Sequence, residues 1–435
     1  MNTVFPFGAT ASGHTLISIV LLQLVLIIVA ARFFGWLARK LSQPVVVGEI
    51  IGGLLMGPTF FRPLFPELFE FIFDPAVKPV FTSMKELGLM MLLFIVGMEF
   101  EFSHLRHLGK AAVMISLIGI LLPFSFGVSL APWLHTKLEM TTELWGLILF
   151  LGCSLSITAL PILGRMMIEM GITKTRLATV TISAAAVDDA IAWILLATIV
   201  AAVEAKFNIM NMVIMIASTI LFLTCMITVV RPWLRRWLDY HLKEKTQLDA
   251  LGFTVILTLL FICGWITLKI GIFASFGAFV LGTTLAGHPR LHQALGDSFR
   301  SFVSSFFMPI FFTYTGLQTD VGQLNSWQQV MFLLLIVTAA IVGKLVGCGL
   351  AARWSGFSWR EAGIVGTMMN TRALMALIVI NVGMDHGILN PVIFTMLVLM
   401  AIITTIMTTP LLVLLYPGTE LEQPIKQSGF FQRSR

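Results

Sequence analysis

Long apolar segments recur from about residue 15 to residue 415, and this feature constrains the fold of the chain more than any other. Of its 435 residues 57% are apolar and only 11% are charged, whereas a typical soluble domain carries about 25% charged residues. One compact core cannot hide this much apolar surface from water, so the lipid bilayer is the expected solvent. Helices satisfy their own backbone hydrogen bonds in lipid. The chain is therefore predicted to be an all-α, polytopic membrane protein.

A helix needs roughly 20 apolar residues to cross a hydrocarbon core of about 30 Å. The first fourteen residues contain no Lys or Arg, so the first apolar run is interpreted as a true span rather than a signal peptide. By this ruler the sequence predicts thirteen spans, of which the second, ninth and tenth are short: 15–38, 45–57, 80–98, 111–133, 144–167, 177–203, 209–230, 248–268, 270–286, 302–317, 330–352, 362–383 and 391–415.

The basic residues predict an orientation. With the N-terminus outside, 20 of the 28 Lys and Arg residues fall on the cytoplasmic side and 6, Lys85 among them, on the outer side. This bias follows the positive-inside rule, and it explains the net charge of +6 without nucleic acid as a partner. We expect a bacterial inner or plasma membrane, with the C-terminus inside. The last two basic residues, Lys344 and Arg372, lie within spans.

The cysteines lie in apolar runs and lack the spacing of a metal site. Inert, buried thiols are predicted, with no disulfide framework and no cofactor. The four positions are Cys153, Cys225, Cys263 and Cys348.

Two spans are interrupted by polar residues near their middle. If thirteen spans divide into six, one linker and six, then 144–167 and 362–383 are the fifth spans of the two halves. Paired interruptions of this kind indicate the midplane site of a transporter, and Pro161 supplies a cause for the first because it removes a helical hydrogen bond. The interrupting residues are Ser154, Ser156, Thr158 and Pro161 in the first span and Asn370, Thr371 and Arg372 in the second.

Asp188 and Asp189 lie at the centre of the span 177–203. A single charge there costs about 2.5–3.5 kcal/mol on insertion scales, and two adjacent carboxylates repel each other, which favours a proton on one of them. The alternative is a helix end that reaches water, but apolar residues flank the pair on both sides. Neighbours on a helix point about 100° apart, so one carboxylate can face an ion cavity while the other faces a neighbouring helix.

Lys344 is central to the span 330–352. An unpaired buried ammonium would lose its proton, so we expect a pair with one of the aspartates, which a cation can disrupt. The alternative is a side chain that reaches the membrane interface.

The other polar residues within spans have less specific interpretations. Thr158 and Ser156 offer oxygen ligands to Na⁺ or K⁺, or else bond back to their own helix. Arg372 is interpreted as structural, at the C-terminal end of a broken half-helix or on a carboxylate, with direct transport as the alternative. Glu49 is interpreted as structural near a helix N-terminus, and the nearby small residues Gly48, Gly52, Gly53 and Gly57 as helix packing.

The motifs together resemble a known family. The stretch Gln43–Pro58 (QPVVVGEIIGGLLMGP) is similar to the opening of the monovalent cation:proton antiporter family 2, which includes sodium/proton antiporters, Kef-type potassium/proton systems and plant cation/proton exchangers. The resemblance covers about 15–415. The remaining motifs follow in the family's order: Leu93–Phe100 (LFIVGMEF), Ser156–Pro161 (SITALP), Asp188-Asp189, Gly343-Lys344 and Met369–Arg372 (MNTR).

The resemblance implies an inverted-repeat sodium/proton-antiporter fold within 15–415, with 144–167 and 362–383 as two crossing broken helices. The polar composition of 416–435 separately predicts a short cytoplasmic tail. It also implies a homodimer, with a mobile core drawn in part from 80–203 and 302–415 and dimerisation helices from the remainder. For the site it implies that Asp188 pairs with Lys344, while Asp189 binds the ion beside Thr158.

The function predicted is secondary active exchange of a monovalent cation for protons by alternating access. The aspartate pair favours Na⁺ or Li⁺ and electrogenic exchange, with Asp189, Asp188 and Thr158 as transient ligands. The Asn-Thr-Arg stretch at 370–372 looks more like the plant exchangers and leaves K⁺/H⁺ exchange open. Two alternative functions fit the sequence less well. An intramembrane aspartyl protease needs aspartates on two facing helices, whereas Asp188 and Asp189 are adjacent on one, and a buried lysine does not suit a cation channel.

Overall fold

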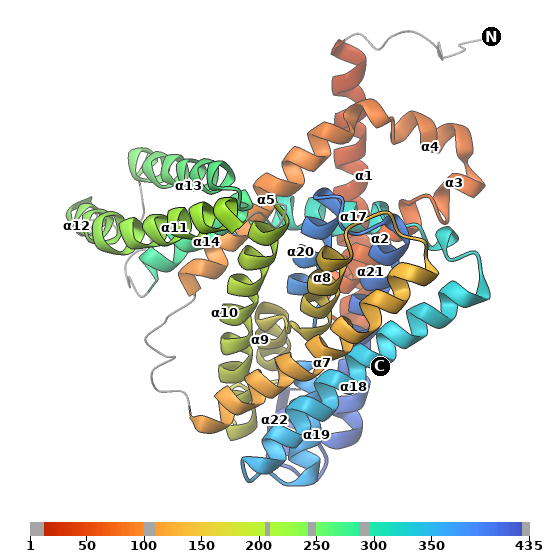
Figure 1. Cartoon of the computed structure of the whole chain (residues 1–435), viewed down its shortest axis with the longest axis vertical. Coiled ribbons are helices and arrows are strands. Elements are labelled where there is room, and N and C mark those ends of the chain that lie inside the picture. The colour runs from red at the N-terminus through yellow and green to blue at the C-terminus, as the bar shows by residue number, and fades with distance from the viewer. Residues whose placement is uncertain (1–12, 100–108, 205–208, 242–248, 287–295, 429–435) are drawn as a thin grey trace.

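The computed structural model describes residues 13–99, 109–204, 209–241, 249–286 and 296–428, and within these ranges it contains helices and no β-strand (Figure 1). The first half of the chain forms α1 (Gly13–Lys40), α2 (Val45–Met56), α3 (Phe61–Leu64), α4 (Pro66–Ile72), η1 (Pro75–Val77), α5 (Lys78–Glu99), α7 (Lys110–Lys137), α8 (Leu144–Ser156), α9 (Leu160–Glu169) and α10 (Arg176–Glu204).

The second half is helical as well. In chain order they are α11 (Ile209–Cys225), η2 (Met226–Val230), α12 (Arg231–His241), α13 (Ala250–Ile270), α14 (Ala274–Leu285), α16 (Gly296–Phe302), η3 (Val303–Phe307), α17 (Met308–Leu317), η4 (Val321–Gln323), α18 (Trp327–Trp354), α19 (Trp359–Met369), α20 (Ala373–Asp385), α21 (Pro391–Leu415) and α22 (Glu422–Ser428).

Each of the thirteen predicted spans overlaps one or more of the described helices. By length and apolarity, ten of the described helices can cross a membrane, and eleven if the bent pair α19–α20 counts as one span. The two segments left over are the short α14 and the stretch α16–η3–α17. The all-helical membrane class is thus confirmed, while the count of thirteen stays a prediction.

Apolar side chains cover outward-facing surfaces of the molecule. On α1, the residues Ile17, Leu21, Val25 and Val29 recur every four positions and are 57–61% exposed. Residues four apart share one face of a helix, so this face of α1 presents a continuous apolar stripe to its surroundings. Such a stripe would be costly in water and is at no disadvantage against lipid chains.

The helices pack in two groups. In the first, α5 packs along α14 and against α17, α17 packs against α2, and α2 against α1. In the second, α7 and α18 run side by side (Figure 1). Helices α8, α10, α19 and α21 pack against one or both of them, and α20 packs against α8 and α21. The division into a mobile core and a dimerisation part stays a prediction. Helices α5 and α17 lie in the ranges assigned in part to the core, yet α17 packs against α1 and α2, and α5 packs against α17.

A close crossing of α2 and α17 depends on Gly53. A Cβ atom at this position would lie 1.9 Å from the backbone oxygen of Thr313. We expect Gly53→Ala to lower the free energy of unfolding by about 1–3 kcal/mol because the helices must separate. The measurement is thermal unfolding in detergent, with Gly164→Ala as the matched control, since a Cβ there meets nothing within 4 Å. Equal midpoints for the two variants would contradict the prediction.

Two sequence-based placements were wrong. Lys85 does not lie in an outer loop: its side chain is 2% exposed inside α5, because Asp385 of α20 supplies a carboxylate partner at 2.9 Å. Cys225 is exposed rather than buried, because it sits on an outward face of the apolar helix α11, whereas Cys153, Cys263 and Cys348 are buried as predicted.

Some predicted features lie outside the described residues. They are the motif residue Phe100, the first residue of the span 248–268, and the loop and tail charges Arg106, Lys206, Lys243, Lys245, Arg290, Arg433 and Arg435.

Candidate functional site

The predicted interruption of the span 144–167 is present as a gap between α8 and α9. The backbone leaves the helix at Ile157 (φ −85°, ψ 140°) and re-enters it after Ala159 (φ −103°, ψ 91°). Pro161 lies in the first turn of α9, where its missing N–H costs no hydrogen bond and its fixed φ suits a helix start. The proline therefore favours the start of a new helix at this depth.

The second interruption separates α19 from α20, which are bent by 41°. Asn370, Thr371 and Arg372 form the break, and all three side chains are buried. The two breaks meet, because the N–H of Ala159 donates to the carbonyl of Thr371 at 2.8 Å. The hydroxyl of Thr405 on α21 also accepts from the N–H of Ala373 at 3.1 Å. Backbone groups freed by each break are thus satisfied by other parts of the protein, as irregular backbone in a membrane requires.

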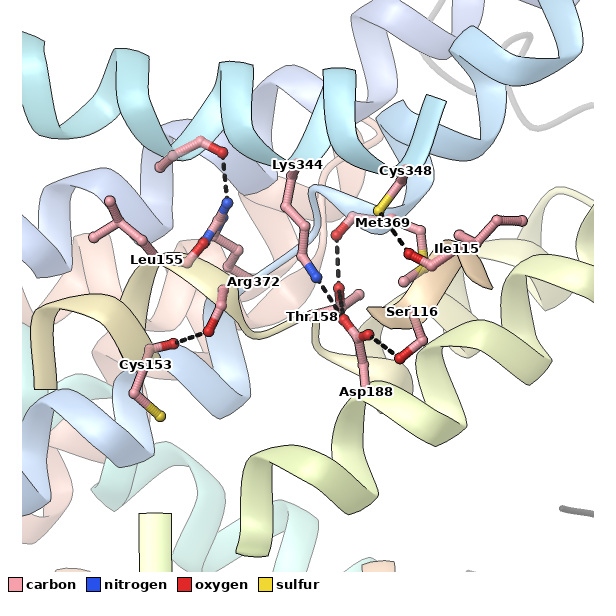
Figure 2. Close-up of polar contacts among 12 residues, drawn as sticks. Ile115, Ser116, Cys153, Leu155, Thr158, Asp188, Lys344, Cys348, Met369 and Arg372 are labelled. Carbon is pink, nitrogen blue, oxygen red and sulfur yellow. Dashed lines mark hydrogen bonds and ion pairs between the residues drawn. The ribbon is translucent and has the colours of Figure 1, made fainter. Parts of the chain in front are cut away.

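Three side chains from three elements converge on Asp188 (Figure 2). The ammonium of Lys344 on α18 lies 2.5 Å from Oδ2, the hydroxyl of Thr158 donates to the same oxygen at 2.8 Å, and the hydroxyl of Ser116 on α7 donates to Oδ1 at 2.6 Å. All four side chains are fully buried. A buried carboxylate with a cation and two hydroxyl donors is well compensated, so these three partners offset the cost of burying Asp188.

Thr158 links this ion pair to the second broken helix. Its hydroxyl oxygen lies 2.8 Å from Oδ2 of Asp188 and 2.8 Å from the carbonyl oxygen of Met369, the last residue of α19. A hydroxyl has a single proton, so it donates to only one of these acceptors at a time. A change in the charge of Asp188 would therefore change which acceptor Thr158 donates to, and with it the hydrogen bond at the end of α19.

Asp189 stands in a different environment from its neighbour. The residue is 1% exposed, and neither carboxylate oxygen has a hydrogen-bond partner among the described residues. The amide of Leu160, the first residue of α9, lies close enough to interact but does not form a well-aligned hydrogen bond. A buried carboxylate without a partner is costly unless it binds a proton or a cation.

Further unpaired polar groups occur in the two broken helices. Ser154 of α8, Thr367 of α19 and Asn370 have buried side-chain atoms without hydrogen-bond partners in the described structure. Buried polar atoms are nearly always satisfied by protein, water or an ion. These side chains have polar atoms available to a water molecule or an ion beside the two breaks.

Arg372 lies beside the end of α8 rather than beside a carboxylate. Its guanidinium donates to the carbonyls of Leu155 and Ser154 in the last turn of α8 and, at 2.6 Å, to the carbonyl of Ala340 on α18. A cation at a helix C-terminus interacts favourably with the helix dipole and the free carbonyls. This geometry suits the structural role predicted for Arg372, which stays a prediction.

The structure brings together most of the predicted site residues but not all. Asp188, Lys344 and Thr158 are in direct contact, whereas the hydroxyl of Ser156 bonds back to the carbonyl of Cys153 at 3.0 Å, the alternative considered for it. Thr371 contacts the hydroxyl of Thr408 at 3.3 Å. Glu49 is buried in α2, within the other helix group. Ser116 was missed, because one serine in an apolar span is unremarkable until its partner is known.

Comparisons with known proteins place the chain in a family. The model of the family described as "sodium/hydrogen exchanger, transmembrane" matches residues 26–414. The chain is 38% identical to the Na⁺/H⁺ antiporter NhaS4 of Synechocystis, over 92% of this chain and 98% of that protein. It is 34% identical to cation/H⁺ antiporter 17 of Arabidopsis thaliana, over 96% of this chain but only 52% of that longer protein.

A solved structure shares the fold. The sodium proton antiporter MjNhaP1 of Methanocaldococcus jannaschii superposes with a TM-score of 0.61 at 16% identity, over 94% of this chain and 99% of that one. The sodium/proton-antiporter fold predicted from the sequence is thereby confirmed. With two interrupted helices that cross beside a buried Asp-Lys pair, and a family match along nearly its whole length, this chain belongs to the transmembrane sodium/hydrogen exchanger family.

Proposed function

We propose that this protein exchanges a monovalent cation for protons across a membrane and that Asp189 is the principal ligand for both. The observation that carries the proposal is the pair of unsatisfied carboxylate oxygens on Asp189, buried at the crossing of the two broken helices. A cation or a proton neutralises this carboxylate equally well, so the two compete for one site. Family membership makes the chain a transporter rather than an enzyme.

Asp188 and Lys344 are proposed to couple the site to charge movement. While Lys344 pairs with Asp188, the buried charge of these two residues sums to zero and only Asp189 needs a counter-charge. A cation that is shared by Asp189, Asp188 and Thr158 would displace Lys344, whose ammonium then becomes free to lose its proton. Two carboxylates thus allow two protons per cation, and exchange is expected to be electrogenic.

Alternating access follows from the cost of buried charge. A core with an empty, ionised Asp189 carries an uncompensated charge and crosses the hydrocarbon region at high cost. A core with a bound proton or cation does not. Exchange without leak therefore requires only that the helices around the crossing move when Asp189 is occupied.

Sodium is proposed as the preferred cation, with Li⁺ as its analogue and K⁺ as the second candidate. The adjacent aspartates favour Na⁺ by resemblance to electrogenic exchangers, and the relative NhaS4 is named as a Na⁺/H⁺ antiporter. The Asn-Thr-Arg stretch, which looks more like the plant exchangers, leaves K⁺ open, and the name of the plant relative specifies only a cation. We further propose a homodimer in a bacterial plasma membrane, with the N-terminus outside and the C-terminus inside.

Proton movement in everted vesicles from antiporter-deficient cells tests the function. We expect Na⁺ and Li⁺ to dissipate a preformed pH gradient in vesicles that contain the protein. A response to K⁺ alone would move the assignment to potassium/proton exchange. No response to any of the three, with the protein inserted and folded, would contradict the antiport function. Robust exchange without current in proteoliposomes would contradict only its electrogenic character.

A further inference from the structure

A second buried lysine lies outside the site described above. Lys85 of α5 is 2% exposed, and its ammonium donates to the two oxygens of Asp385 at 2.9 and 3.3 Å and to Oδ1 of Asn381 at 3.3 Å. The amide of Asn381 in turn donates to the hydroxyl of Thr315 at 3.1 Å. One continuous network therefore joins α5, α17 and α20.

The network crosses the boundary between the two helix groups. Lys85 and Thr315 belong to α5 and α17 in the first group, whereas Asn381 and Asp385 belong to α20 in the second. Helix α20 shares little backbone packing with α5 or α17. The polar network therefore adds a specific contact between the two groups, beside the buried apolar side chains of α5, α17 and α20 that share one core cluster.

A cavity of about 270 Å³ lies along the same boundary. Its lining includes Lys85 and Glu86 of α5, Ser275 of α14, Phe311 of α17, Asp385 and His386. Glu86 is close enough to Lys85 for the two charges to interact. If Asp385 moved away, Lys85 would keep a carboxylate nearby, so the ion pair can open without leaving an isolated buried charge.

Helix α20 connects the Lys85–Asp385 ion pair to the break at the crossing. Asp385 is the last residue of α20, whose first residue follows the Asn370–Arg372 break at the crossing. Thirteen residues of helix span roughly 20 Å, and the helix transmits a shift of one end to the other as a rigid body. The Lys85–Asp385 contact therefore restrains α20, and through α20 the position of the break beside the ion site.

We propose that Lys85, Asn381 and Asp385 form a latch that holds α20 against α5 and α17 in one access state and must open for the protein to reach the other. The proposal rests on the alternating-access function proposed above and names the residues that set its resting state. When the latch opens, the boundary between the two helix groups widens and the cavity at Ser275 becomes accessible to water-soluble reagents.

Reactivity of a cysteine in the cavity tests the latch without relying on transport. Ser275 is 4% exposed in the latched state, so Ser275→Cys, built on Cys225→Ser to remove the exposed native thiol, should react slowly with a membrane-impermeant maleimide. The reagent is applied separately to each membrane face in the full-length protein. We expect Lys85→Met and Asp385→Asn each to speed labelling by about five- to tenfold. The expected factor is modest because Asp385 is partly exposed, and a partly exposed ion pair stabilises a contact less than a fully buried one.

Matched variants separate the latch from general loosening. Lys78→Met removes an exposed lysine from the same helix and should leave the labelling rate unchanged. The charge-exchanged variant Lys85→Asp with Asp385→Lys restores the ion pair and should return labelling toward the parent rate. If a single variant fails to insert, the charge-exchanged variant still tests the latch. Labelling far above the parent rate in a properly inserted, charge-exchanged protein would overturn the proposal.

The latch and the transport function fail in different ways. Labelling at the parent rate in both Lys85→Met and Asp385→Asn, in protein that still moves protons in response to cations, would overturn the latch and leave the antiport function standing. Absence of cation-dependent proton movement in the parent protein would overturn the function. In that case faster labelling of the single variants would still show that the ion pair closes the cavity.

Discussion

Replacing Asp189 with asparagine is expected to reduce cation-dependent proton movement to the level of vesicles that lack the protein. The asparagine amide neither binds a proton in this pH range nor neutralises a cation, so both substrates lose their shared ligand. The fold should survive, because the carboxylate of Asp189 has no hydrogen-bond partner among the described residues. Its removal relieves an unpaired buried charge instead of breaking a contact.

The experiment compares Asp189→Asn with Glu67→Gln, which removes an exposed carboxylate on α4. Glu67→Gln should transport normally. The thermal midpoint of Asp189→Asn in detergent should equal or exceed that of the parent. Substantial exchange by Asp189→Asn would contradict the assignment of Asp189 as principal ligand, and a large fall in its midpoint would show that the carboxylate has a structural partner.

Replacing Lys344 with methionine is expected to destabilise the protein strongly. The ammonium and the Asp188 carboxylate are both fully buried and lie 2.5 Å apart. Removing one member of such a pair leaves an uncompensated buried charge, at a cost of about 3–5 kcal/mol. The hydroxyls of Ser116 and Thr158 remain as donors to Asp188 and offset part of this loss. Thermal unfolding in detergent at constant pH measures the change.

A double-mutant cycle isolates the pair itself. Asp188→Asn alone should also destabilise the protein, because Lys344 then lacks its counter-charge. The double variant Asp188→Asn with Lys344→Met contains neither charge and should be clearly more stable than the sum of the two single losses predicts. Strictly additive losses would contradict a direct pair between these residues.

The sequence was sufficient for properties that depend on local composition. A long span can be recognised because its apolar length must match the bilayer, whatever its neighbours are, whereas the short segments 270–286 and 302–317 stay predictions. The breaks at Thr158–Pro161 and Asn370–Arg372 can be recognised because polar residues and proline weaken a helix where they stand. The aspartate pair is conspicuous because two adjacent carboxylates in an apolar span have no local explanation. These features, in their order, also carried the resemblance to the antiporter family.

Partner choice was beyond the sequence except where the resemblance supplied it. Lys344 and Asp188 lie 156 positions apart, and only the resemblance said which aspartate Lys344 would meet. Nothing in the sequence distinguished Ser116 from other scattered serines. For Arg372 the sequence left open whether the guanidinium meets the end of a broken half-helix or a carboxylate.

Lys85 shows the reason most clearly. Near the start of its span it looked like an ordinary loop charge, yet it is buried against Asp385, which lies 300 positions away. Apolar length and helix breaks are set by each segment's own contact with lipid, so the sequence determines them alone. Which charges meet is set by how helices cross, and that was decided only by the tertiary structure, because a buried ion forms where a partner from another helix arrives to compensate it.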